Sequence, residues 1–129
     1  MTMEDHTCII ITLGRQTLED RPEGYRGVIR DFARTRREEN PWVWWHRCKG
    51  LPRLPPEQTE YVYFIVGNKL RWRAAMVQHL RSTGIYDEGA GRSLPPGNWI
   101  CLTNIEPVPP EHRFTRRGFQ GFRYSPRLY

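Results

Sequence analysis

The sequence predicts an α+β fold, mostly β, in which five or six strands form a small mixed pseudo-barrel with one early helix packed on it. Apolar runs rich in β-branched and aromatic residues recur between clusters of glycine and proline. Only one stretch, near the N-terminus, has the apolar spacing of a helix. With 129 residues, the chain is expected to be a single domain over residues 1–129.

The first element is predicted to be a buried strand over residues 6–13, because this run is rich in β-branched side chains. A polar connection follows over residues 14–23. The next element is predicted to be a helix, because apolar residues recur at i, i+3, i+4, i+7 and i+8, namely Tyr25, Val28, Ile29, Phe32 and Ala33. Pro41 ends this helix, since the residue before a proline avoids the helical region.

Four arginines share a second face of this helix: Arg26, Arg30, Arg34 and Arg37. We expect a solvated face with partial pairing to Asp31 and Glu38. A face that tracks phosphates is the alternative.

Residues 42–48 are predicted to form a tryptophan-rich strand. Strand alternation places Trp42, Trp44 and His46 on one face, and it places Val43, Trp45 and Arg47 on the other. One face is expected to pack into the barrel, with His46 in a structural role. The other face could form an aromatic wall beside Arg47 and Lys49 that holds a base.

Two apolar runs, residues 60–66 and 69–77, flank Gly67-Asn68 and predict a β-hairpin. The glycine- and proline-rich stretch 78–97 is expected to be a long loop, and residues 98–105 another strand. Prolines then interrupt the chain before a final basic and aromatic strand over residues 113–124.

The charge of the chain favours polyanionic partners. The net charge is +6, although residues 1–24 carry five acids and two arginines, so the remainder carries +9. Only Lys49 and Lys69 among the 20 basic residues are lysines, and arginine suits bidentate phosphate contacts and base stacking.

The cysteines and the N-terminus indicate a cytoplasmic protein. Cys8, Cys48 and Cys101 are odd in number and far apart, which predicts free thiols in a reducing compartment. No pair has the spacing of a zinc ligand set, so we expect no structural metal and no cofactor. The apolar run 8–13 is too short to cross a bilayer, and acidic residues precede it, so we expect neither a signal peptide nor a membrane partner.

The layout of these elements over residues 6–124 resembles the PUA-like superfamily, particularly its ASCH and EVE-type members. The likeness lies in the early strand and helix, the tryptophan-rich strand, the hairpin, the strand opened by Asn98-Trp99-Ile100, and the closing run 119–124. The resemblance implies a pseudo-barrel that binds RNA or reads modified bases in DNA in a cleft, with a few members acting as hydrolases. Residues 14–21 offer the Gly, Thr and Arg of the ASCH signature but no Lys, so the catalytic lysine of the nucleoside amidohydrolase type is not carried over.

The C-terminal run combines cations, aromatics and glycines, the components that bind an unstacked nucleotide. We predict that Arg116, Arg117 and Arg123 contact phosphate and that Phe119 or Phe122 stacks on a base, with Gln120 as a further binding residue. The alternative is that Phe119, Phe122 and Tyr124 fill the core. The other candidate nucleic-acid-binding residues are Trp44, Trp45, Arg47, Lys49, Arg71 and Arg73.

The sequence therefore predicts a nucleic-acid-binding domain that recognises single-stranded RNA or a modified, flipped base by arginine–phosphate contacts and aromatic stacking. We expect binding rather than catalysis, because the histidines are scattered and no hydrolase or nucleotide-binding motif occurs. The alternatives are an ASCH-type hydrolase acting on a nucleoside or RNA, and a phage or mobile-element accessory protein that binds a protein partner. The acidic N-terminus beside a basic body would also permit a homodimer.

Overall fold

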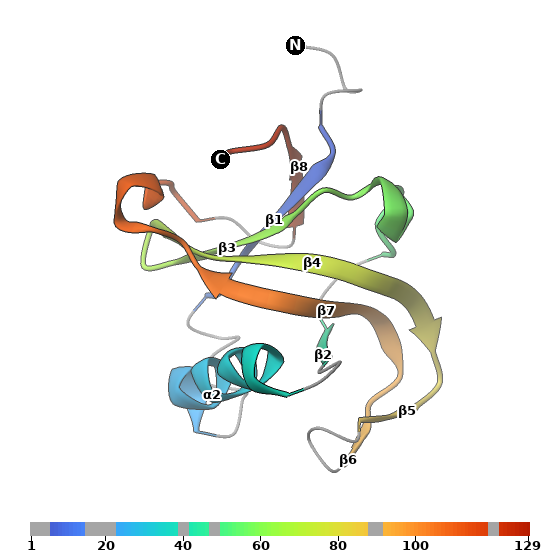
Figure 1. Cartoon of the computed structure of the whole chain (residues 1–129). Coiled ribbons are helices and arrows are strands. Elements are labelled where there is room, and N and C mark those ends of the chain that lie inside the picture. Colours follow the sequence, from blue (N-terminus) through green and yellow to red (C-terminus); the bar gives the residue numbers. More distant parts are fainter. Residues whose placement is uncertain (1–5, 15–22, 39–41, 47–49, 88–91, 119–121) are drawn as a thin grey trace.

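Six strands pair into one mixed sheet in the order β2-β7-β4-β3-β1-β8 in the computed structural model of the chain (Figure 1). The structure describes residues 6–14, 23–38, 42–46, 50–87, 92–118 and 122–129. β1 lies parallel to β3, and the other neighbours are antiparallel. The strands of this sheet are β1 (Cys8–Thr12), β2 (Val43–His46), β3 (Val62–Val66), β4 (Lys69–Ser82), β7 (Gly97–Pro107) and β8 (Phe122–Ser125). The predicted α+β class, mostly β, is confirmed.

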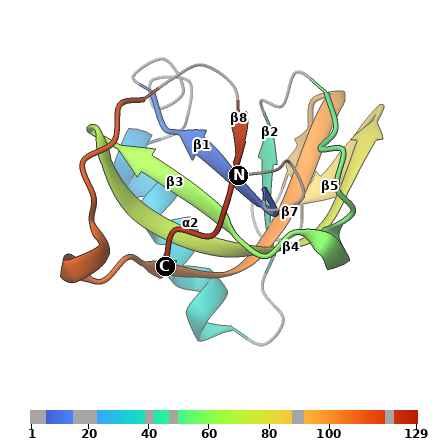
Figure 2. The same cartoon turned by 90° about the horizontal axis from the view of Figure 1, so that it is seen from above.

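The predicted barrel is not closed among the described residues. Closure would require the two outermost strands to hydrogen-bond to each other. Here β2 pairs with β7 and β8 pairs with β1, so each forms an edge of the sheet. The view from above shows the strands fanning through a large twist (Figure 2), as right-handed strand twist requires. The sheet is therefore curled but open.

Helix α2 (Gly24–Arg37) covers one face of the sheet (Figure 1). Its stripe buries Val28 and Phe32, as the periodicity predicted. The Phe32 ring lies 5.4 Å from the rings of Phe64 and Trp72, and 6.0 Å from Trp45. Trp45 is only 1% exposed, so the prediction that it could stack on a base is wrong. Its ring fills the space under the helix, because the Val43 face of β2 points into the core.

The two faces of β1 belong to different apolar clusters. Ile9 and Ile11 pack toward α2, whereas Cys8 and Ile10 join Tyr63 on the opposite face. The predicted free thiols are confirmed at Cys8 and Cys101, both of them buried, while Cys48 lies outside the described residues. Burial raises the pKa of the Cys8 thiol, so this cysteine stays protonated and unreactive at neutral pH.

The predicted hairpin is confirmed between β3 and β4. Gly67 and Asn68 have φ angles of 58° and 60°, the left-handed pair that a type I′ turn requires. Glycine adopts this region without strain, and asparagine tolerates it better than most residues do.

The stretch 78–97 is not the long loop that its glycines and prolines suggested. β4 continues to Ser82 and pairs with β7 as far as Gly97, and β5 (Ile85–Asp87) forms a two-stranded sheet with β6 (Arg92–Leu94). Two irregularities in the β4–β7 register bend this long pair. Glycine and proline mark the ends of short strands here, and pairing with β7 holds the rest extended.

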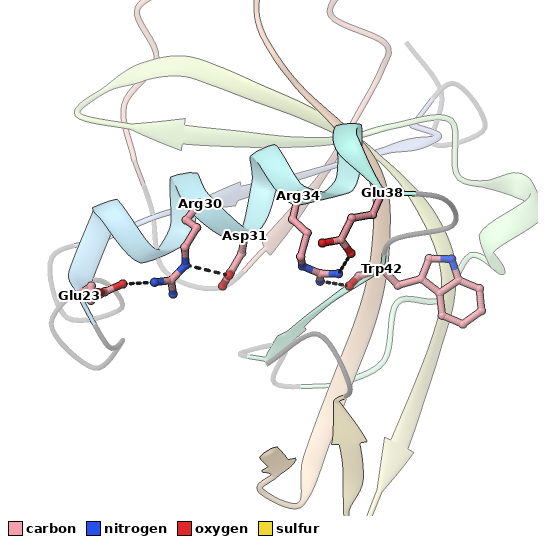
Figure 3. A network of polar contacts seen from close by, with 6 residues as sticks. All are labelled: Glu23, Arg30, Asp31, Arg34, Glu38 and Trp42. Atoms are coloured by element: carbon pink, nitrogen blue, oxygen red, sulfur yellow. Dashed lines mark hydrogen bonds and ion pairs between the residues drawn. The ribbon is translucent and has the colours of Figure 1, made fainter. Parts of the chain in front are cut away.

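The arginine face of α2 is partly paired, as expected. Arg30 contacts Glu23 and lies 3.8 Å from Asp31, and Arg34 lies 3.3 Å from Glu38 (Figure 3). Cations in the last turn of α2 also interact favourably with the negative, C-terminal end of the helix dipole. Within the described ranges, no helix has both the length and the apolar composition needed to cross a membrane.

Thr35 joins α2 to the bulged part of β7. Its buried hydroxyl donates to the Phe32 carbonyl at 2.7 Å and accepts from the Ile105 N–H at 3.2 Å. We expect Thr35→Val to lower the free energy of unfolding by about 1–3 kcal/mol, because the Ile105 N–H loses its acceptor.

Thr35→Ser is the matched control, since it keeps the hydroxyl and removes only a methyl group. Urea unfolding of both variants measures the difference. Equal losses in the two variants would show that the hydrogen bond is not the stabilising contact.

Candidate nucleic-acid interface

The chain after β7 returns to the start of β4 and pairs with it. Leu70 donates its N–H to the Phe114 carbonyl at 3.0 Å, and Arg116 donates its N–H to the Asn68 carbonyl at 2.7 Å. We call residues 113–118 the docked segment. These two hydrogen bonds fix it along the edge of β4 that β7 has left, so its side chains are positioned by the sheet.

Two further contacts hold the end of the docked segment. The Asn68 Oδ1 accepts from the Gly118 N–H at 3.3 Å. A Cβ atom at Gly118 would lie 2.8 Å from Cγ2 of Thr12, so the close approach to β1 requires glycine. The turn residue Asn68 therefore both closes the hairpin and anchors the segment.

This pairing gathers cations that are far apart in the sequence. We call the exposed residues on the two paired segments the basic ridge: Lys69, Arg113, Phe114, Arg116 and Arg117. The Arg113 Nε donates to the Val108 carbonyl at 2.9 Å, which fixes the direction of that guanidinium. Phe114 is 46% exposed and rests edge-on against His112. The ridge thus offers four positive groups and one open aromatic ring.

Of the residues predicted from sequence, Arg116 and Arg117 lie on the basic ridge. The sequence does not indicate Lys69 as a nucleic-acid-binding residue, because nothing in it links the hairpin turn to residue 116. Arg113 and Phe114 belong to the predicted final strand over residues 113–124. Only the structure shows that both side chains are exposed on the docked segment and do not belong to the core.

Arg73 has a structural role instead of the predicted phosphate contact. Its guanidinium lies over the rings of Tyr61 and Tyr129 at 4.0 and 4.2 Å. It also donates to Glu106 Oε1 at 3.0 Å and to the main-chain oxygen of Tyr129 at 3.2 Å. With only 17% of its side chain exposed, it is occupied inside the protein and ties the final residues to the sheet.

The predicted C-terminal residues that lie on β8 point to opposite faces of this strand. Phe122 and Tyr124 pack against the helix-facing core, which is the alternative that the sequence left open for them. Arg123, between them, is exposed on the other side of the strand. The Tyr124 ring lies under the Arg53 guanidinium at 3.9 Å, and its hydroxyl accepts from the Arg53 N–H at 2.6 Å.

The remaining predicted residues are not brought to the ridge by any described contact. Trp44 on β2 and Arg71 on β4 are half-buried. Four predicted site residues lie outside the described part of the chain: Arg47, Lys49, Phe119 and Gln120. Among the residues that the structure does describe, no three histidine, cysteine or acidic side chains are grouped to hold a metal ion.

Burial raises the pKa of Tyr63 and of Tyr129 above the ordinary value for tyrosine. The Tyr63 hydroxyl accepts from the Leu128 N–H at 3.1 Å and donates to the Tyr129 main-chain oxygen at 3.3 Å. A raised pKa means that the folded state favours the neutral phenol. Stability is therefore complete below the unfolded pKa of about 10 and falls as pH rises through the folded values.

We expect absorbance at 295 nm to show Tyr63 and Tyr129 ionising above the ordinary tyrosine pKa, and urea unfolding to show a loss of stability as pH rises above about 10. Tyr63→Phe should remove one of the late ionisations and reduce that loss. A variant that unfolds with the same pH dependence as the wild type would contradict this assignment.

Asn68 can be tested by comparing two substitutions. Asn68→Gly keeps the left-handed turn and removes only the acceptor for Gly118, so we expect faster hydrogen exchange in the docked segment with little change in global stability. Asn68→Ala also strains the turn, and should cost about 1–2 kcal/mol more than glycine. Equal exchange rates at Gly118 in Asn68→Gly and the wild type would show that the side chain does not anchor the segment.

Comparison of the chain with protein-family models, with curated proteins and with solved structures gives no match. The resemblance to the PUA-like superfamily is therefore carried by the layout of residues alone, and the functional argument depends on the geometry of this chain's own side chains.

Proposed function

We propose that this protein binds nucleic acid, with single-stranded RNA or a modified, flipped base as the ligand, and that the basic ridge makes the phosphate contacts. The observation that carries the proposal is the pairing of the docked segment with β4, which sets Lys69 opposite Thr115 and so brings its backbone next to the segment that carries Arg116 and Arg117. The proposal agrees with what the PUA-like layout implies, and it keeps the cytoplasmic location expected from the sequence.

The chemistry of the ridge suits a phosphate backbone. Guanidinium groups form bidentate hydrogen bonds with phosphate oxygens, and a lysine adds a mobile point charge. No acidic residue occurs within the docked segment, so its arginines have no carboxylate neighbour on their own segment to compete with a phosphate. The net charge of +6 adds a long-range attraction for polyanions.

The helix arginines are the weaker candidates for the same role. Arg30 and Arg34 already contact carboxylates on or beside α2. A phosphate there would have to displace an acid and would then lie close to its negative charge. The solvated, partly paired face expected from the sequence is therefore the better description of α2.

The exposed ring of Phe114 favours an unpaired strand over a duplex. A base can lie against an aromatic ring only when it is unstacked from its neighbours, and each such contact contributes about 1–3 kcal/mol. Cations on both sides of Phe114 in the sequence would hold the backbone on either side of that base.

We expect Arg116→Ala combined with Arg117→Ala to weaken binding of a short single-stranded RNA by about tenfold or more near physiological salt, because two phosphate contacts are lost. The slope of log affinity against log salt should fall by about 1.4. Fluorescence anisotropy of a labelled oligonucleotide at several salt concentrations measures both quantities.

The matched control is Arg26→Ala with Arg37→Ala, which removes the same charge from exposed positions on α2. It should reduce affinity only through the smaller net charge. If the two double variants lose affinity equally, binding is a property of net charge and the ridge is not the site.

A further inference from the structure

A groove of about 740 Å³ lies where the C-terminal end of α2 meets the bulged part of β4 and β7. It is separate from the basic ridge, since none of the ridge residues lines it. The lining side chains that decide its chemistry are Arg36, Glu38, Trp42, Arg73, Asn104 and Glu106.

Trp42 presents an open ring from a fixed position in this groove. Its main-chain oxygen accepts from Arg34 at 2.6 Å, and Arg34 is in turn paired with Glu38. Figure 3 shows the indole extending away from these polar contacts, and the residue is 45% exposed. A large aromatic ring held at its backbone and open at its face is a preorganised stacking surface.

Asn104 supplies a polar group that the strand would not otherwise turn into the groove. It has a φ angle of 50° and lies in the irregular part of the β4–β7 pairing, between the Arg73–Glu106 and Ala75–Thr103 pairs. Bulges of this kind redirect a side chain, and strained backbone in a groove often marks a binding site. The amide offers one donor group and one acceptor, which can read the edge of a planar ligand.

The charges in the groove cancel, in contrast to those on the ridge. Two arginines face two glutamates, and Arg73 already donates to Glu106 at 3.0 Å. A phosphate group would therefore gain little electrostatic attraction in the groove, whereas an uncharged planar group would bind there without charge repulsion. Glu106 keeps 48% of its side chain exposed, so its carboxylate can still accept from an amino group.

We propose that this groove binds the nucleobase of an unstacked nucleotide, with the base stacked on Trp42 and its edge read by Asn104 and Glu106. The inference rests on the proposed function, because it supplies the base site for the strand whose phosphates the ridge holds. Lys69 on the ridge and Arg73 in the groove are four residues apart on β4, about 13 Å. A carboxylate beside an amide favours bases with an exocyclic amino group, such as adenine and cytosine, over uracil.

The test is titration of the protein with adenosine, cytidine and uridine, and then with adenosine monophosphate, while the indole N–H signal of Trp42 is followed by NMR. Trp42→Phe identifies that signal. We expect adenosine and cytidine to shift it more than uridine does, with affinities that barely change between low and high salt. The monophosphate should bind about as well as the nucleoside, because the groove is neutral.

Two variants and one control sharpen the result. Trp42→Ala should lower nucleoside affinity by about tenfold or more. Asn104→Gly suits the left-handed backbone, so it keeps the fold and should remove the preference between bases. Tyr86→Ala, which removes a ring that is 63% exposed on β5, should leave nucleoside binding unchanged.

The outcomes separate this inference from the proposed function. Nucleosides that leave the Trp42 signal unmoved at millimolar concentration, while the ridge variants still lose RNA, would overturn the groove and leave the ridge standing. If nucleosides bind in the groove as expected but the ridge variants bind RNA normally, the groove is supported as the base site and the ridge is overturned as the phosphate site. A monophosphate that binds far more tightly than its nucleoside, in a salt-dependent way, would show that the groove is a phosphate site and overturn the inference.

Discussion

The structure depends on the pairing of the β4 edge that faces β7, which has hydrogen-bond partners along the whole length of the strand. A strand buried in a sheet must pair its N–H and C=O groups on each side. β3 pairs with one edge of β4 from Lys69 to Ala74, and β7 pairs with the other edge from Trp72 to Ser82. Beyond the end of β7, Val108 and then the docked segment take over. The start of β4 extends beyond the end of β7, and the docked segment pairs with it there. The cations of the ridge therefore lie on backbone that is held by sheet hydrogen bonds and not on a free loop.

The same pair of strands creates the groove by departing from regular pairing. Register shifts bend β4 and β7 together, and Asn104 takes up the left-handed backbone at that point. Thr35 then closes α2 onto β7 through the Ile105 N–H. Arg73, which also lines the groove, lies between two tyrosine rings and holds the last residues of the described chain. The irregular region is thus held by contacts to α2 and to the C-terminal residues, as a base-reading surface requires.

Charge separates two surfaces on one strand. Among the described residues, no carboxylate forms an ion pair with the positive groups of the ridge, so long-range attraction and salt dependence belong to it. The groove carries balanced charges, so shape, stacking and hydrogen bonding act there with little electrostatic steering. A ligand with a charged backbone and neutral bases matches both surfaces, and this division makes the two proposals independently testable.

The sequence by itself determined the local structure. Residue spacing predicted α2 with Val28 and Phe32 buried, and the Gly67-Asn68 turn was predicted by the apolar runs on each side of it. Alternation within β2 put Trp42 and Trp45 on opposite faces, but it could not say which face was buried. For the site, the sequence found Arg116 and Arg117. What only the tertiary structure decided was pairing between distant segments: the open sheet, the β5–β6 hairpin, the contacts that enclose Arg73, and the pairing of Lys69 with Thr115. Periodicity is a property of one segment, whereas register and proximity depend on partners far along the chain, and so a single sequence cannot supply them.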